Sequence, residues 1–120
     1  MTTVYVTAPR DAAAELAEEL VERGLAACVN VVDCDSVYRW EGDVVSDPEA
    51  ILIVKTTEEA YEDLAAAVEE LHPYDVPCIE RFDEDAVAEP FAAWVDDSVT
   101  PRAGDRGDDP DHHDGHDHPT

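Results

Sequence analysis

The pattern of hydrophobic and polar residues predicts a different secondary structure for each of the first two segments of this chain. Residues 2–8 are rich in β-branched side chains and predict a strand. Apolar side chains then recur at helical spacing over residues 13–21. Asp11 is a candidate N-cap for this helix, and Gly24 stands where a helix commonly ends. The segment therefore predicts a strand followed directly by an amphipathic helix.

The rest of the folded part continues the alternation of strands and helices. A long β-prone stretch, a turn at Gly42-Asp43 and a break at Asp47-Pro48 precede a strand that is apolar on both faces. The further expected elements are strands at 27–40, 49–56 and 78–83, helices at 61–71 and 88–99, and a capping box from Thr56 to Glu59. The order β-α-β-β-α-β plus a terminal helix predicts an α+β fold, with a four-stranded antiparallel sheet and two helices on one face.

The composition changes after Thr100-Pro101. The remaining residues contain six Asp and four His and no large apolar side chain. Such a segment cannot bury enough apolar surface to offset the entropy lost on ordering. We therefore expect one folded domain at residues 1–99 and a disordered, acidic and histidine-rich tail at residues 100–120.

The strongly negative net charge indicates the salt environment of the protein and limits its expected binding partners. The chain has 31 acidic residues against 7 basic ones, with a net charge of −24, and only one lysine. Molar salt shortens the Debye length to about 3 Å and removes most of the self-repulsion, which favours a halophilic protein. The alternative is an ordinary acidic protein that binds a basic partner. Without a basic patch, the chain is not expected to bind nucleic acid.

The cysteines and the apolar runs indicate the compartment. Cys28, Cys34 and Cys78 are odd in number and form no CxxC spacing, so a closed disulfide framework is not expected. Each is a candidate thiolate ligand or a small buried hydrophobe. The first residues predict a strand and not a leader, and no apolar run is long enough to span a membrane. We expect a cytoplasmic protein with reduced thiols.

A proline-bracketed turn carries the strongest candidate chemistry. Pro73 and Pro77 fix the backbone around His72 and Tyr74, just after one helix and before a strand. His72 is a candidate ligand for copper or zinc, since imidazole suits both metals. The alternative is a turn histidine that only forms local hydrogen bonds.

At this point the chain resembles the CutA divalent-cation tolerance family. The residues that carry the resemblance are Thr7-Ala8-Pro9, Leu25 to Asn30, Ser36-x-Tyr38-x-Trp40-x-Gly42, Glu49, Lys55-Thr56, His72-Pro73-Tyr74-x-Val76-Pro77 and Trp94. They come in the family's order and span roughly residues 4–98. Single motifs are weak signals, whereas the full series is specific.

The resemblance implies a ferredoxin-like sandwich assembled into a tight homotrimer, similar to the PII signalling proteins. It also implies a link to copper and divalent-metal tolerance. A metal site proposed for the family uses a first-strand cysteine and a second histidine, and these positions hold Val6 and Leu71 here.

Two groups of residues remain as candidate binding sites. The first is metal-binding, for Cu²⁺, Zn²⁺ or Ni²⁺, and consists of His72 with His112, His113, His116 and His118 of the tail. The tail is alternatively an acidic segment with incidental histidines. The second is a pocket between subunits, lined by Tyr38, Trp40, Glu49, Lys55, Tyr74 and Trp94. For Lys55 a subunit-bridging ion pair is the alternative, and for Trp94 it is simple packing.

Catalysis is not expected, because the chain has no GxSxG, HExxH or phosphate-loop motif. The sequence thus favours a non-enzymatic, CutA-like trimer that binds divalent cations and serves metal tolerance. The alternative is a PII-like module that binds a small anionic ligand at the subunit interface.

Overall fold

A computed structural model describes residues 1–100 of the chain, and the predicted tail lies outside this range apart from Thr100. The elements are β1 (Thr2–Pro9), α1 (Arg10–Glu22), β2 (Cys28–Trp40), β3 (Asp43–Thr56), α2 (Tyr61–Leu71), β4 (Ile79–Asp83) and α3 (Glu89–Ser98). Both the order and the types of these elements match the prediction. No helix within residues 1–100 is long and apolar enough to cross a membrane.

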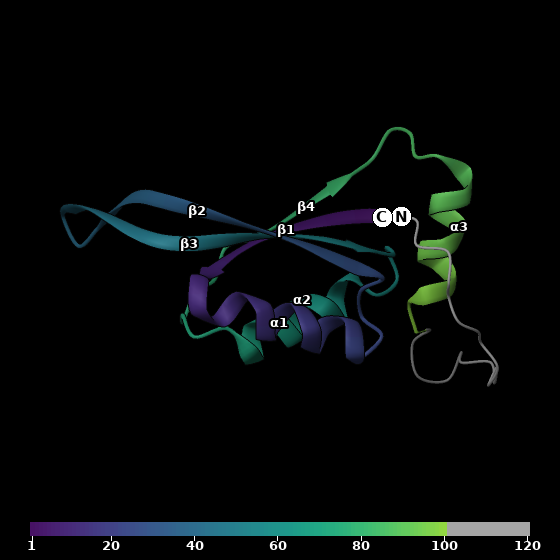
Figure 1. Ribbon diagram of the computed structural model, residues 1–120, viewed down its shortest axis with the longest axis horizontal. Coiled ribbons are helices and arrows are strands. Elements are labelled where there is room, and N and C mark those ends of the chain that lie inside the picture. The colour runs from purple at the N-terminus through teal and green to yellow at the C-terminus, as the bar shows by residue number, and fades with distance from the viewer. Residues whose placement is uncertain (101–120) are drawn as a thin grey trace.

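The four strands form one antiparallel sheet in the order β2-β3-β1-β4. Helices α1 and α2 lie side by side against one face, and α3 stands beside the end of the sheet (Figure 1). The fold is therefore the α+β, ferredoxin-like sandwich with a C-terminal helix.

The main core lies between the sheet and the helix pair. In β1 every second residue is fully buried, and the same alternation holds for the second half of β3. The buried strand residues are Val4, Val6, Ala8, Ala50, Leu52 and Val54, and they meet Leu16 and Leu20 of α1 and Leu64 and Val68 of α2. Strand alternation and helical spacing thus direct both apolar stripes into one core.

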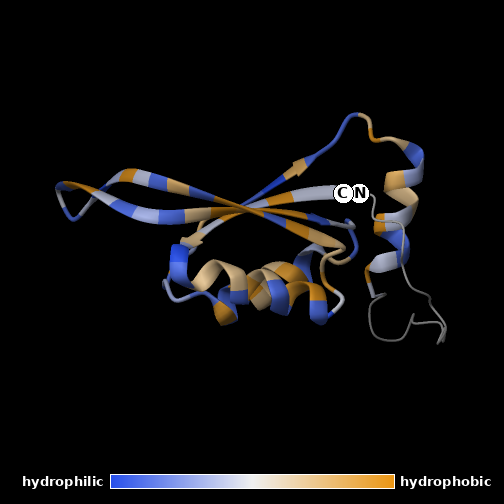
Figure 2. Ribbon diagram, viewed as in Figure 1, coloured by the Kyte–Doolittle hydropathy of each residue, from blue (hydrophilic) through white to orange (hydrophobic). Residues whose placement is uncertain are grey.

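Beyond the core, β2 and β3 continue as a two-stranded arm. We use "the arm" for residues 35–48, which pair only with each other, because β1 ends at the pair Pro9–Glu49. The arm projects away from the helices, and hydrophobic and hydrophilic bands alternate along it (Figures 1 and 2). The break expected at Asp47-Pro48 was wrong, since β3 runs through Pro48 without interruption. A strand with one neighbour tolerates a residue that lacks the backbone N–H.

The helix starts differ from the predicted caps. α1 begins at Arg10, directly after Pro9, and no side chain caps it, so Asp11 is a first-turn residue and not the N-cap. The fixed φ of Pro9, with a ψ of 143°, gives an extended backbone directly before the helix. Before α2, the Thr57 hydroxyl accepts the Ala60 N–H at 3.2 Å. Thr56 is not a cap, because its hydroxyl donates to the Leu25 carbonyl at 2.7 Å.

A second, smaller core joins α3 to the rest of the chain. Ala27, Ala60, Val95 and Val99 are buried there, with Phe91 and Trp94 packed against them. The end of α3 is held to the end of α1, since the Thr100 N–H donates to the Gly24 carbonyl at 2.7 Å. Gly24 closes α1 as predicted, with a φ of +75° that favours glycine.

Candidate functional site

The turn after α2 holds His72 in a fixed orientation. Its side chain is 6% exposed. Nε2 lies 2.7 Å from the Thr7 carbonyl oxygen, and Nδ1 accepts the Tyr74 N–H at 3.1 Å. A carbonyl oxygen only accepts, so Nε2 carries the proton and Nδ1 offers the lone pair. Both nitrogens of His72 are therefore engaged inside the chain, and a metal would have to displace one of these partners.

A buried carboxylate lies next to this turn. Glu49 of β3 is 5% exposed and accepts hydrogen bonds from the Ser36 hydroxyl at 2.6 Å and the Tyr74 hydroxyl at 3.0 Å. These two donors come from β2 and from the proline-bracketed turn. Hydrogen bonds to an ionised acceptor are among the stronger ones in proteins. Glu49 therefore links the base of the arm to the turn that carries His72.

Two tyrosine hydroxyls near this carboxylate have raised pKa values. Burial, followed by the hydrogen bond to Glu49, raises the pKa of Tyr74 to about 12. On the arm, the Tyr38 hydroxyl donates to Asp47, and this hydrogen bond raises the pKa of Tyr38. Both phenols therefore act as proton donors to carboxylates and not as bases near neutral pH.

The remaining residues of the predicted pocket lie elsewhere in the single chain. Lys55 stands at the far end of β3 from Glu49, six residues or about 20 Å away. Its Nζ donates to Asn30 Oδ1 at 3.3 Å, and within residues 1–100 it forms no ion pair. Trp40 is 62% exposed at the tip of the arm. Trp94 packs on α3 with a ring-centroid distance of 5.7 Å to Phe91. One chain brings together only Tyr38, Glu49 and Tyr74.

Residues 1–100 contain no cluster of three His, Cys, Asp or Glu side chains that could hold a metal ion. The three thiols are free and only partly buried, so the prediction of buried small residues holds in part. Burial raises the pKa of Cys28 and of Cys78, which disfavours the thiolate form a metal would need. The four tail histidines, His112, His113, His116 and His118, lie outside the described residues.

Two polar residues of the site were not assigned a role from the sequence. Ser36 and Asp47 are directly paired across β2 and β3, on the same sheet face as Glu49 and Tyr38. Counting the hairpin register outward from the Gly42 turn would have placed them together. This register was not considered, because the strand was expected to begin only after a break at Asp47-Pro48.

Comparison with known proteins identifies the class to which this α+β chain belongs. The model of the CutA1 divalent ion tolerance protein family matches residues 2–98. The chain is therefore a member of the CutA1 family.

Individual relatives support this assignment. The divalent-cation tolerance protein CutA of Pyrococcus horikoshii is 40% identical over 96 residues, which cover 79% of this chain and 94% of the relative. CutA of Thermus thermophilus is 50% identical over 76 residues, covering 62% of this chain and 74% of the relative.

Solved structures agree. A crystal structure of CutA1 from P. horikoshii, 37% identical, covers 83% of this chain and 99% of its own, with a TM-score of 0.81. The PII-like protein CutA of Nostoc sp. PCC 7120, in apo form and 29% identical, covers 84% of this chain and 99% of its own, with a TM-score of 0.82.

Proposed function

We propose that this chain is a cytoplasmic divalent-cation tolerance protein that binds divalent cations, with no enzymatic activity. The observation that carries the proposal is the family match over nearly the whole described range, together with relatives named for divalent-cation tolerance. The histidine- and aspartate-rich tail of this chain adds ligands suited to Cu²⁺, Zn²⁺ or Ni²⁺. Copper is the cation that we expect to bind most tightly, in line with the order of divalent affinities.

The tail histidines are the stronger ligand candidates. His112, His113, His116 and His118 alternate with aspartates, so two or more imidazoles can reach one ion without a preformed site. His72 is the weaker candidate, since both of its ring nitrogens already hold hydrogen bonds. In this proposal the folded part presents the tails, and the tails hold the metal.

Assembly into a homotrimer is part of the proposal. Val37 and Val44 of the arm are 68% and 64% exposed, and Trp40 at its tip is 62% exposed. Val37 and Trp40 differ in strand parity, so the two faces of the arm each carry exposed apolar side chains. Another subunit would cover them, and would also satisfy the free edges of the two strands.

The metal proposal is tested by equilibrium dialysis of the full chain against Cu²⁺, Zn²⁺ and Ni²⁺ at high KCl. The test variant replaces the four tail histidines by alanine, and His72→Gln is the matched change in the folded part. We expect the tail variant to lose most of the bound metal and His72→Gln to retain it. A wild-type chain that retains none of the three ions would refute metal binding.

The second candidate function is a PII-like module that takes a small anionic ligand between subunits. Lys55 favours it, because this lone lysine of a strongly acidic chain forms no ion pair within residues 1–100. Assembly would have to bring Lys55 and Trp94 toward Tyr38, Trp40, Glu49 and Tyr74 of a neighbour. The carboxylates of Glu49 and Asp47 would repel an anionic ligand. In this alternative the Lys55 ammonium of the adjoining subunit would therefore have to lie between the ligand and these carboxylates.

Thermal-shift screening with small anionic metabolites tests this alternative. A stabilising compound whose effect is lost in Lys55→Ala and kept in Arg39→Ala supports the interface site. Arg39 is the matched control, because it is an exposed base whose guanidinium donates to the Gly42 carbonyl at 3.5 Å and forms no ion pair within residues 1–100. Equal loss in both variants would indicate non-specific attraction to positive charge.

A further inference from the structure

A small groove lies on the helical layer, between α1 and the C-terminal end of α2. Its volume is about 100 Å³. The lining residues are Ala12, Glu15, Leu16, Glu19, Leu71 and Pro73. Leu16 also belongs to the main core, so the apolar floor of the groove continues into the core. Sites that enclose a drug-sized ligand have volumes of about 300–1,000 Å³, so this groove suits a single side chain.

Apolar surface continues from the groove onto the proline-bracketed turn. Leu71 is 36% exposed, and Val76 of the turn is 86% exposed, the highest value among the large apolar side chains within residues 1–100. The two prolines restrict the backbone of this turn, and the Tyr74 N–H donates to His72 Nδ1 at 3.1 Å. A surface that is already ordered loses little conformational entropy when a partner binds to it.

The groove is flanked by negative charge. Glu19 pairs with Arg23 at 3.0 Å, whereas Glu15 of the groove and Asp75 of the turn form no ion pair within residues 1–100. An apolar floor with flanking carboxylates is complementary to an aliphatic side chain that has lysine or arginine neighbours. A second copy of this chain would bring the same net charge of −24, and like charges oppose such a contact.

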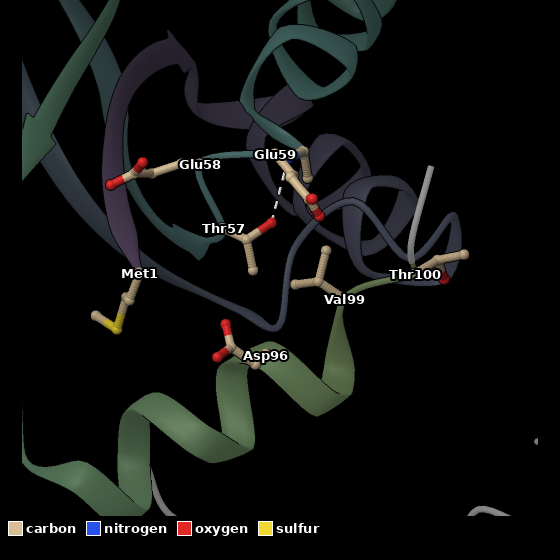
Figure 3. Close-up of a pocket in the computed structure, with 8 residues that line it drawn as sticks. Met1, Thr57, Glu58, Glu59, Asp96, Val99 and Thr100 are labelled. Carbon is tan, nitrogen blue, oxygen red and sulfur yellow. Dashed lines mark hydrogen bonds between the residues drawn. The ribbon is translucent and has the colours of Figure 1, made fainter. Parts of the chain in front are cut away.

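Another acidic hollow shows that charge alone does not select the groove. Its volume is about 390 Å³, and it lies between the N-terminus, the loop before α2 and the end of α3. The lining includes the carboxylates of Glu58, Glu59 and Asp96, drawn with Met1 and Val99 in Figure 3. Because this hollow is wider and has more carboxylates than the groove, attraction by charge alone would favour the hollow.

We propose that the groove binds one aliphatic side chain of a basic protein segment, whose lysine or arginine side chains face Glu15 and Asp75. The aliphatic anchor would remove water from Leu16 and Leu71, and a buried anchor of this kind usually supplies most of the affinity of an interface. The flanking charges would mainly add specificity and a faster association. The inference is independent of metal binding and goes beyond the proposed function.

The test is an NMR titration of the full chain at moderate KCl with a synthetic peptide that carries one leucine between two pairs of lysines. The control peptide has serine in place of the leucine, and we expect it to bind at least about tenfold more weakly. The amides of Glu15 and Leu71 report on the groove. Ala12→Leu fills the groove and should abolish the preference for leucine. Ala14→Leu is the matched control, because Ala14 is an exposed residue of the same helix and does not line the groove.

Charge variants give the second readout. Glu15→Gln should weaken binding of the leucine peptide about two- to fivefold, whereas Glu58→Gln in the larger hollow should leave it unchanged. Molar KCl should remove the effect of Glu15→Gln and keep the preference for leucine, because screening acts on the charges. Equal binding of the two peptides, or equal effects of Ala12→Leu and Ala14→Leu, would overturn the proposal. A change in the sedimentation of the chain alone, seen in Ala12→Leu and not in Ala14→Leu, would assign the groove to a second copy and would also overturn it.

Discussion

The two halves of the long β2–β3 hairpin have opposite environments. Over residues 50–56 of β3, every second side chain is fully buried against α1 and α2. In the arm no residue is fully buried, and Val37 and Val44 stay exposed because no helix within residues 1–100 covers them. Coverage by the helices therefore produces a core in one half of the hairpin, and its absence leaves apolar side chains on the surface in the other.

The difference shows which half of the hairpin is packed within the single chain and which half leaves apolar side chains exposed. In the covered half, Ala50, Leu52 and Val54 of β3 are fully buried within one subunit. The arm offers two faces and two edges, a combination that natural proteins usually pair or cover. Changes in the covered half should therefore act on folding, and changes in the arm should act on assembly.

The largest effect is expected in the covered half. Leu52→Ala removes a fully buried side chain between the sheet and the helices and should lower the free energy of unfolding by about 2–5 kcal/mol. Urea unfolding at fixed protein concentration and fixed KCl measures it. Val37→Ala in the arm is the control. Equal losses in the two variants would mean that the arm is as deeply packed as the core, and would end the distinction.

The next largest effect is expected where α3 is held to α1. Gly24→Ala introduces a methyl group that overlaps Thr100, at a φ of +75°. We expect a loss of about 1–3 kcal/mol in unfolding free energy. Gly42→Ala is matched in backbone strain, with a φ of +89°, but meets open space at the hairpin turn. The difference in unfolding free energy between Gly24→Ala and Gly42→Ala measures the overlap with Thr100 alone. Equal losses in the two variants would show that Thr100 moves aside without an energetic cost.

Much of the covered half could be predicted from the sequence, for a physical reason. The alternation of residues 2–8, the helical spacing up to Leu20 and the glycine at position 24 all depend on neighbours a few residues apart. The uninterrupted β3 could not be predicted from Pro48 alone. Proline breaks a central strand and is tolerated on an edge, and only the register with β1 shows that β3 has become an edge there.

The site was predictable in part. The proline-bracketed turn predicted a set geometry for His72 and Tyr74, and in the structure the Tyr74 N–H donates to His72 Nδ1. The spacing of Glu49 and Lys55 correctly separated these two residues. Which residues share a site depends on the pairing of β2 with β3, which joins positions 13 residues apart, as in the Ser36–Glu49 hydrogen bond. Within residues 1–100 Lys55 and Trp94 lie apart from the others, and one sequence contains no local signal for a contact that only the proposed assembly would form.

A smaller effect is expected at the junction of the two halves. Tyr74→Phe removes the hydrogen bond to Glu49 and should cost about 1 kcal/mol near pH 8. In the folded chain the pKa of Tyr74 is raised to about 12, whereas an unfolded tyrosine titrates near 10. The contribution is therefore complete below pH 10 and is lost as the pH rises towards 12. Unfolding curves at pH 9 and pH 11.5 test this. The wild type should lose more stability than Tyr74→Phe over this interval, and parallel losses would contradict the assignment.

The smallest effect on folding is expected in the arm. Val44→Ser should change the free energy of unfolding by no more than about 0.5 kcal/mol, because the side chain is 64% exposed in the single chain. Its effect should fall on assembly, since an apolar side chain covered by another subunit loses its contribution when it becomes polar. Sedimentation velocity over a dilution series, with circular dichroism on the same samples, separates the two. Loss of mass with an unchanged spectrum places the arm in an interface, whereas loss of the spectrum first would show that the arm holds the fold itself. Ser46→Ala, at the neighbouring position on the same face, is the control for substitution without loss of apolar surface.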